Sequence, residues 1–288
     1  MTAGPGVISL QGTSMAFGRR TLWTGLDFDL APGEFVAVLG INGSGKTTLL
    51  QTILGLTAPT AGRVLVDGAP ARRGSRALGY IPQQRRIAPP APLRARDLVG
   101  VGVDGARFGL AGPRTWRERR RAVDAALDEV GALHLADTPL EVMSGGEQQR
   151  VRVAQALVTD PKALLCDEPL LSLDLNHQQT TVALIDARRR SHGTAVLFVT
   201  HEINPVLPYV DRVLYLAGGR FHIGSVAEVM TSATLTALYG TPVEVVRVGG
   251  RIIVAGLPEH DGPAHAELGL DHGADPDVAD PAPTGRRR

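Results

Sequence analysis

The strongest constraint on how this chain folds is an eight-residue segment, Gly-Ile-Asn-Gly-Ser-Gly-Lys-Thr, at residues 40–47. It has the spacing G-x-x-x-x-G-K-[ST], in which glycines let the backbone curl so that successive N–H groups point toward phosphate oxygens. The apolar run at 35–39 predicts a buried strand before it, and residues 47–54 predict a helix after it. The segment therefore predicts a phosphate-binding loop at a helix N-terminus, where anions are favoured.

Two side chains of this loop have predicted roles of their own. Lys46 supplies a positive charge for the β and γ phosphates of a nucleotide, and Thr47 supplies a hydroxyl for Mg²⁺. Only two of the chain's 30 basic residues are lysines, Lys46 and Lys162, which makes a lysine at this place informative. The residues of this segment that we expect to bind the nucleotide are Gly40, Asn42, Gly43, Ser44, Gly45, Lys46, Thr47 and Thr48.

A second candidate feature is the pair of adjacent carboxylates Asp167 and Glu168, which follow the strand predicted at 163–166. Ligands of open α/β sheets bind at the carboxyl ends of the strands, so the pair is expected near the phosphate loop. There Asp167 is expected to hold Mg²⁺ through its water, and Glu168 to orient the water that attacks the γ-phosphate. Taken alone, the pair is equally compatible with a solvated strand end.

The rest of the chain predicts short strands alternating with helices, which indicates an α/β fold with a largely parallel sheet. Alternating apolar positions over residues 7–30 predict antiparallel strands that precede this sheet. Further elements are predicted as strands at 63–67, 78–81, 195–200 and 212–216, and as helices at 116–130 and 176–190.

Three longer stretches complete the predicted organisation. Residues 84–155, whose first part is rich in Arg, Pro and Gly, are predicted to be a mostly helical insertion. Gly249 and Gly250 predict a two-residue hairpin turn between strands at 243–248 and 251–255. Residues 257–288 contain almost no large apolar residues and predict a disordered tail, which leaves 1–256 as the folded domain.

A third segment, Met-Ser-Gly-Gly-Glu-Gln-Gln-Arg at 143–150, resembles the signature of ABC-family ATPases, and it lies between the phosphate loop and the carboxylate pair, as in that family. Ser144 can also cap a helix whose N-terminal amides accept phosphate. The resemblance covers about residues 7–230. It implies the family's P-loop NTPase fold, with a parallel sheet, an antiparallel β subdomain and a helical insertion, and it implies ATP hydrolysis with ATP and Mg²⁺ as cofactors.

In this family two cassettes pair head to tail, and each ATP lies between one phosphate loop and the other signature. The resemblance therefore implies a homodimer of this chain. The residues implied to contact the partner's nucleotide are Ser144, Gly145, Gly146 and Glu147. The chain departs from the family's commoner residues at Ile41, Met143, Glu147 and Gln155.

Three further positions match the family's catalytic and base-binding residues. Gln83 follows the predicted strand and matches the glutamine that senses the metal and the γ-phosphate, with Gln84 leaving a one-residue ambiguity. His201 matches the switch histidine near the γ-phosphate and Glu168. Phe17 matches the aromatic residue that stacks on adenine, since stacking needs only a flat apolar ring, although core packing is an alternative.

The segment Ser172-Leu173-Asp174 resembles the part of the family that contacts the partner cassette. Its alternative is local, because Asp174 is also a good N-cap for the helix predicted after it. Both interpretations are compatible with each other.

Charge and composition limit the class of protein and the compartment that we expect for this chain. Thirty basic and 29 acidic residues give a net charge of +1, so the chain lacks the basic footprint of a nucleic-acid partner. The single cysteine, Cys166, excludes an internal disulfide. No apolar run reaches the ~18 residues of a spanning helix, and the N-terminus lacks a secretory-signal pattern. We expect a soluble intracellular protein. With the resemblance, this implies a detachable ATPase subunit on the cytoplasmic face of the membrane, bound through separate integral-membrane permease subunits.

The transported substrate is inferred from resemblance alone. The stretch 201–213 and the later Leu238-Tyr239-Gly240 are similar to zinc/manganese importer ATPases. This implies import of a divalent metal ion, with an extracytoplasmic substrate-binding protein in the same system. Import of another substrate such as an iron chelate is the alternative, and a non-transport ABC ATPase is a weaker one. The tail histidines His260, His265 and His272 are irregularly spaced and are not predicted to form a metal site.

Overall fold

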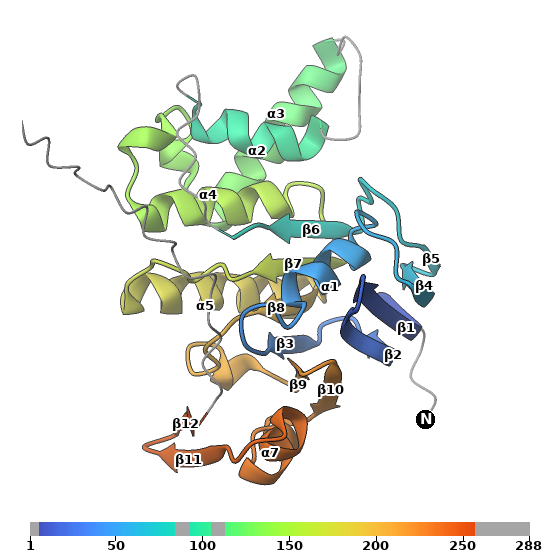
Figure 1. Ribbon diagram of the computed structural model, residues 1–288. Helices are drawn as coiled ribbons and strands as arrows, with labels where there is room; N and C mark the ends of the chain where they lie inside the picture. Colours follow the sequence, from blue (N-terminus) through green and yellow to red (C-terminus); the bar gives the residue numbers. More distant parts are fainter. Residues whose placement is uncertain (1–5, 84–92, 105–112, 257–288) are drawn as a thin grey trace, which may run out of the picture. The chain divides into compact units, whose positions relative to one another are not determined.

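The computed structural model describes residues 6–83, 93–104 and 113–256. The central sheet has the strand order β10-β9-β3-β8-β7-β6 (Figure 1). β9, β3, β8, β7 and β6 run parallel, whereas β10 pairs with β9 in the antiparallel sense. The bounds of these strands are β3 Phe35–Leu39, β6 Leu78–Ile81, β7 Ala163–Asp167, β8 Ala195–Val199, β9 Arg212–Ala217 and β10 Arg220–Gly224. The predicted α/β fold with a largely parallel sheet is confirmed.

A second sheet precedes the central one in sequence and has the order β2-β1-β4-β5. Its strands are all paired antiparallel, which confirms the antiparallel strands predicted at residues 7–30. Their bounds are β1 Ile8–Phe17, β2 Arg20–Leu30, β4 Ala61–Val66 and β5 Ala69–Pro70.

β3 lies at the centre of the packing because its side chains alternate between two hydrophobic clusters. Phe35, Ala37 and Leu39 belong to one cluster, and Val36 and Val38 to the other. The cluster of Val36 and Val38 also contains the apolar side chains of the antiparallel sheet and of helix α1 (Lys46–Ile53). This packing fixes α1, and with it the loop that precedes it, against both sheets.

The opposite cluster joins the sheet to helices that follow β6 in the sequence. Helices α2 (Ala95–Asp104), α3 (Pro113–Glu129) and α4 (Gly145–Leu157) contact one another and lie between β6 and β7 in sequence. α5 (Leu175–His192) connects β7 to β8. Within the described part of the chain, every helix is too short or too polar to span a membrane.

The last described elements are α6 (Val226–Val229), α7 (Ser232–Tyr239) and the hairpin of β11 (Glu244–Val248) and β12 (Arg251–Ala255). Gly249 and Gly250 both have positive φ, at 56° and 77°, as a two-residue turn between twisted strands requires, and the predicted hairpin is confirmed. β10, α6 and α7 were not predicted from the sequence. Gln84, the segment 84–92 and the tail 257–288 lie outside the described residues.

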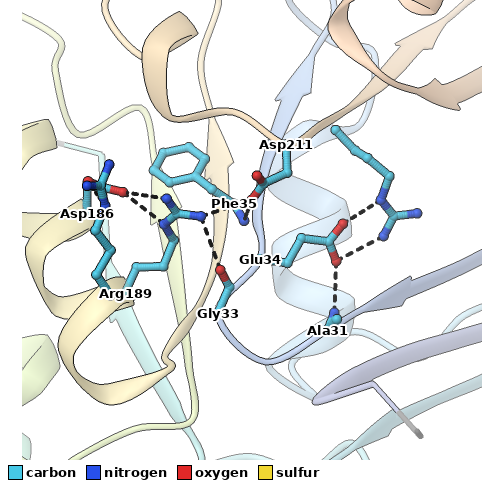
Figure 2. A network of polar contacts seen from close by, with 9 residues as sticks. Ala31, Gly33, Glu34, Phe35, Asp186, Arg189 and Asp211 are labelled. Carbon is cyan, nitrogen blue, oxygen red and sulfur yellow. Dashed lines mark hydrogen bonds and ion pairs between the residues drawn. The ribbon is translucent and has the colours of Figure 1, made fainter. Parts of the chain in front are cut away.

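A polar network fixes the amino-terminal ends of β3 and β9 to α5 (Figure 2). Arg189 donates to Asp186, to the carbonyl of Gly33 and to Asp211, and Asp211 accepts the backbone N–H of Phe35 at 2.8 Å. Since these contacts lie at the start of β3, they leave the carboxyl end of the strand, where Gly40 follows, to bind a ligand.

Candidate functional site

The loop of residues 40–45 takes its shape from glycines in conformations that other residues rarely adopt. Gly40 has φ 147°, and a Cβ there would lie 2.2 Å from the carbonyl oxygen of Leu216 on β9. Gly45 has φ 103°, and a Cβ there would lie 2.9 Å from the ring of Trp23. The loop therefore needs glycine both for its backbone angles and for its close approach to neighbouring elements.

Helix α1 begins at this loop without a side-chain cap. Its N-cap residue is Gly45 and its first turn contains no acidic residue. The first N–H groups of a helix have no partner within the helix, and they carry the positive end of the helix dipole. This helix start thus offers uncapped donors to an anion.

Lys46 is 6% exposed, and its ammonium group donates to the carbonyls of Gly40, at 2.7 Å, and Ile41, at 3.2 Å. Burial lowers the pKa of Lys46. The negative charges of Glu168 and Asp167 act in the opposite direction and raise it by less. The cation is thus held beneath the loop at a fixed place, as expected for a phosphate-binding lysine.

Asp167 at the end of β7 is held from two sides. The hydroxyl of Thr47 donates to Oδ1 and that of Tyr80 to Oδ2, each at 3.3 Å. Burial raises the pKa of Asp167, and the two hydroxyl donors oppose that rise. Burial, with the nearby Asp167 charge, raises the pKa of Tyr80 to about 12, so that Tyr80 keeps its proton and remains a donor at neutral pH.

Glu168 has φ 47°, in the left-handed region that non-glycine residues rarely occupy. Its backbone N–H donates to the carbonyl of Val199 on β8. The amide of Gln83 donates to Oε2 at 3.0 Å, and Nδ1 of His201 lies 4.0 Å from the same oxygen. Strained backbone of this kind is common at functional sites, and here it directs a carboxylate between Gln83 and His201.

Several of these groups line a cavity of about 790 Å³, although Asp167 and Tyr80 do not. It is lined by Phe17, Arg20, Leu22, Asn42, Gly43, Gly45, Lys46, Thr47, Thr48, Gln83, Glu168, Leu171 and His201. The structure therefore brings together most of the residues that were predicted to bind the nucleotide. It also brings the predicted catalytic residues Gln83, Glu168 and His201 to the same place. Gly40 and Ser44 do not line it, and the Ser44 hydroxyl is buried without a hydrogen-bond partner.

Phe17 is 54% exposed at the rim of this cavity, which excludes the alternative that it packs in the core. An exposed ring at a cavity mouth has a face available for stacking on a flat ligand. The sequence left core packing open because Phe17 is part of an alternating strand pattern.

The predicted signature residues lie outside the cavity lining. Ser144 caps α4 by accepting the N–H of Glu147, and the Glu147 carboxylate accepts both the N–H and the hydroxyl of Ser144, each at 2.8 Å. These two donors lower the pKa of Glu147. The signature is thus a capped helix start whose donors are in part satisfied by its own side chains.

Asp174 is the N-cap of α5, since its carboxylate accepts the N–H of His177 at 2.9 Å. It also lies 2.7 Å from Nδ1 of His177, whose ring fills the space in which a Cβ on Gly146 would fall. The capping role proposed for Asp174 is confirmed. The pair His177–Asp174 also places the start of α5 directly against the start of α4.

Two polar residues of the site, Arg20 and Tyr80, and two apolar lining residues, Leu22 and Leu171, were not predicted from the sequence. Arg20 lines the cavity and donates to the carbonyl of Gly43, and Tyr80 contacts Asp167. The available signals were that Arg20 lies three residues after Phe17 and that Tyr80 lies three before Gln83. Neither signal shows which face of a strand the side chain occupies.

Residues able to hold Mg²⁺ are present. The Thr47 hydroxyl and the Asp167 carboxylate are oxygen donors of the kind that Mg²⁺ prefers, and they already contact each other at 3.3 Å. Gln83 contacts Glu168 instead of these two. The described ranges contain no group of three or more His, Cys, Asp or Glu side chains placed to hold a metal ion.

Comparison with protein families gives a match to the ABC transporter family over residues 23–171. Among curated proteins, the chain is 34% identical over 234 residues to the zinc import ATP-binding protein ZnuC of Yersinia enterocolitica, covering 81% of this chain and 85% of that protein. It is 36% identical over 254 residues to the hemin import ATP-binding protein HmuV of Bradyrhizobium diazoefficiens, covering 81% and 88%.

The solved structures that are similar to this chain are also ABC transporter proteins. The chain resembles a metal-chelate type ABC transporter in an inward-facing conformation, with a TM-score of 0.73 and 28% identity over 88% of this chain and 98% of that one. It also resembles a dimeric ATP-binding cassette bound to ADP and Pi, with a TM-score of 0.63 and 27% identity over 76% and 98%.

Proposed function

The chain belongs to the ABC transporter family and is an ATPase, and we propose that its ATP hydrolysis drives import of a divalent metal ion, zinc or manganese, through separate membrane permease subunits. The observation that carries the catalytic part is the position of Glu168, which lies between Gln83 and His201 at the wall of the cavity that also contains the phosphate loop. We assign residues 1–256 to the ATPase domain.

In this proposal the nucleotide is bound by the phosphate loop and by Phe17. Lys46 neutralises the β and γ phosphates, the uncapped start of α1 donates N–H groups to them, and Phe17 stacks on adenine. The Ser44 hydroxyl, which is buried without a protein partner, is a further donor within the loop. The remaining loop contacts are assigned to the backbone of Asn42, Gly43 and Gly45.

We assign Mg²⁺ to Thr47 and Asp167, with Gln83 as a further oxygen donor. The metal supplies positive charge that offsets the negative charge of the phosphate oxygens. Glu168 orients the attacking water and accepts its proton at the carboxylate, and Gln83 and His201 hold that carboxylate in place.

The second half of the proposed site comes from another copy of the chain. Ser144, Gly145, Gly146 and Glu147 lie outside the cavity of their own chain, as required if they act on the nucleotide of a partner. We therefore propose a head-to-tail homodimer. It is bound to integral-membrane permease subunits at the cytoplasmic face of the membrane, and it acts together with an extracytoplasmic substrate-binding protein.

The choice of a divalent metal ion is supported by the zinc importer named above and by the likeness of residues 201–213 and 238–240 to zinc/manganese importers. The second candidate substrate is hemin or another iron chelate. It is favoured by the hemin importer, which matches at comparable identity and coverage, and by the metal-chelate type transporter.

Growth of a strain that lacks this chain tests the substrate. We expect poor growth under combined zinc and manganese starvation, corrected by added zinc or manganese and by the wild-type chain but not by Glu168→Gln. A defect corrected only by hemin or an iron chelate would favour the second candidate. Normal growth in all these media would contradict import of either substrate.

A further inference from the structure

Arg20 is the first residue of β2 and faces the nucleotide cavity beside Phe17. The β1–β2 register pairs Arg20 with Phe17, the last residue of β1. Directly paired residues of antiparallel strands project from the same face of the sheet. The guanidinium group and the exposed ring therefore extend from the tip of one hairpin to the same side, and both line the cavity.

The guanidinium group of Arg20 is anchored on the phosphate loop. One Nη2–H donates to the carbonyl of Gly43 at 2.7 Å in an exposed setting. Because a guanidinium group has five N–H donors in a planar fork, this bond leaves other donors for a ligand in the cavity. The anchor also limits the side-chain entropy that Arg20 would lose on binding a ligand.

The charges around the cavity favour an anionic ligand at this position. Lys46 is buried beneath the loop and holds its carbonyls, whereas Arg20 lies at the exposed outer rim. Glu168 is the acidic residue among those that line the cavity. A nucleotide triphosphate carries several negative charges, and planar guanidinium groups pair well with phosphate oxygens.

We propose that Arg20 is a second phosphate-binding cation, which contacts the phosphate chain of the bound nucleotide from the outer rim of the loop while Lys46 contacts it from beneath. This inference rests on the nucleotide-binding role of the cavity in the proposed function. It assigns to the hairpin tip a dual role, with Phe17 for the base and Arg20 for the phosphates.

Three variants of the full chain separate the effect of the Arg20 charge from that of its hydrogen bond to the Gly43 carbonyl. Arg20→Gln removes the charge and keeps an N–H donor only on a shorter side chain, and Arg20→Lys keeps the charge without the fork. Arg19→Gln is the matched control, because Arg19 is the exposed neighbour in the hairpin turn and does not line the cavity. Equilibrium binding of ATP, ADP and adenosine is measured at low and high salt. Tryptophan fluorescence, to which the buried Trp23 and the exposed Trp116 contribute, is the check on folding.

We expect Arg20→Gln to weaken ATP and ADP binding roughly tenfold or more, as for loss of a hydrogen bond to a charged group, and to leave adenosine binding unchanged. Arg20→Lys should retain most of the affinity, and Arg19→Gln should bind as the wild type does. The ratio between wild type and Arg20→Gln should fall as salt rises, because an exposed charge pair is screened.

Wild-type ATP affinity in a folded Arg20→Gln variant would overturn the proposal and leave Arg20 as an anchor of the hairpin. Equal losses in Arg20→Gln and Arg19→Gln would also overturn it, in favour of a general effect of surface charge. A loss of adenosine binding as large as that of ATP would assign the effect to Phe17 and the base. Failure of the wild-type chain to bind ATP at all would instead reject the nucleotide site itself, together with this inference.

Discussion

Two helix starts of this chain are candidates for binding phosphate, and they are built in opposite ways. α1 begins at Gly45 with no side-chain cap and no acidic residue in its first turn. α4 begins after Ser144 with a complete capping box, in which Glu147 accepts two hydrogen bonds from Ser144. The first start leaves its donors to a ligand, whereas the second already satisfies some of its donors with its own side chains.

The difference follows from what surrounds each start. α1 is held by two sheets and by buried Lys46, so it needs no cap to be stable. α4 begins at an exposed position, where an uncapped helix end would fray, and a capping box stabilises it. A phosphate that reaches α4 from a partner chain must therefore take the Ser144 hydroxyl from Glu147, which carries a negative charge of its own. We infer that the α1 site binds nucleotide within its own chain, and that the α4 site contacts phosphate only when a partner chain brings its bound nucleotide there.

The largest effect is predicted for Glu168, and it tests whether the α1 side of the proposed two-chain site is the catalytic one. Glu168→Gln should lower steady-state ATP hydrolysis by about 10²- to 10⁴-fold, because the amide cannot accept the proton of the attacking water. ATP binding should be kept, since Glu168 is not part of the loop. Glu202→Gln is the control, as Glu202 is exposed nearby but does not line the cavity. Unchanged hydrolysis in Glu168→Gln would remove this residue from the mechanism.

A matched pair of glycine substitutions tests the packing of the α4 start. In Gly146→Ala the new Cβ would fall 1.9 Å from the His177 ring, which must move and leave Asp174. We expect a loss of about 1–3 kcal/mol in the free energy of unfolding, as for overpacking. In Gly145→Ala the nearest atom would be 3.9 Å away, so the higher helix propensity of alanine should leave stability unchanged or raised.

Urea unfolding of both glycine variants checks this prediction. Equal stability of the two would show that His177 does not confine the start of α4.

Ser144→Ala tests the cap itself. It should cost about 1 kcal/mol of stability, the usual cost of losing an N-cap, and it should also weaken ATP-dependent pairing. Ser225→Ala is the control, because Ser225 and Glu228 form the same capping box at the start of α6. Thermal unfolding and chromatography with ATP, in the Glu168→Gln background, measure the two effects. Weaker pairing in both variants would assign the effect to stability alone.

The smallest predicted effect concerns the charge of Glu147. Glu147→Gln keeps the geometry of the box, so stability at neutral pH should change less than in Ser144→Ala. The folded-state pKa of Glu147 is lowered by Ser144, so its stabilisation is present above its unfolded pKa and is lost as the pH falls through the lowered folded value. Wild type should therefore lose more stability than Glu147→Gln below about pH 4.

Acid unfolding curves of Glu147→Gln and of Glu228→Gln, in the twin box, check this prediction. Parallel curves for wild type and Glu147→Gln would show that the box does not depend on charge. ATP-dependent pairing of Glu147→Gln should be at least as strong as that of the wild type, because the substitution removes a negative charge at the proposed phosphate contact.

Much of the fold was predictable because its signals are local. Alternation at residues 7–30, the buried runs of β3 and β7 and the Gly249-Gly250 turn each occupy a few consecutive residues and were confirmed. β10, α6 and α7 were not predicted. β10 takes its place by pairing with β9, and α7 by packing Leu235 into a core whose other members are distant in sequence.

The sequence by itself determined the phosphate loop, because glycine spacing and the lysine act within eight residues. Only the tertiary structure decided which side chains from distant parts of the sequence meet at the end of this loop. Thr47 reaches Asp167 across 120 residues of sequence, and Tyr80 reaches it across 87. Thr47 comes near Asp167 because β3, which precedes the loop, pairs in parallel with β8, and β8 pairs in parallel with β7. Tyr80 comes near it because β6 pairs with β7 in a parallel register, which brings the two strands' carboxyl ends to one edge of the sheet. A one-residue slip of that register would turn Tyr80 to the other face, and no local pattern in the sequence fixes it.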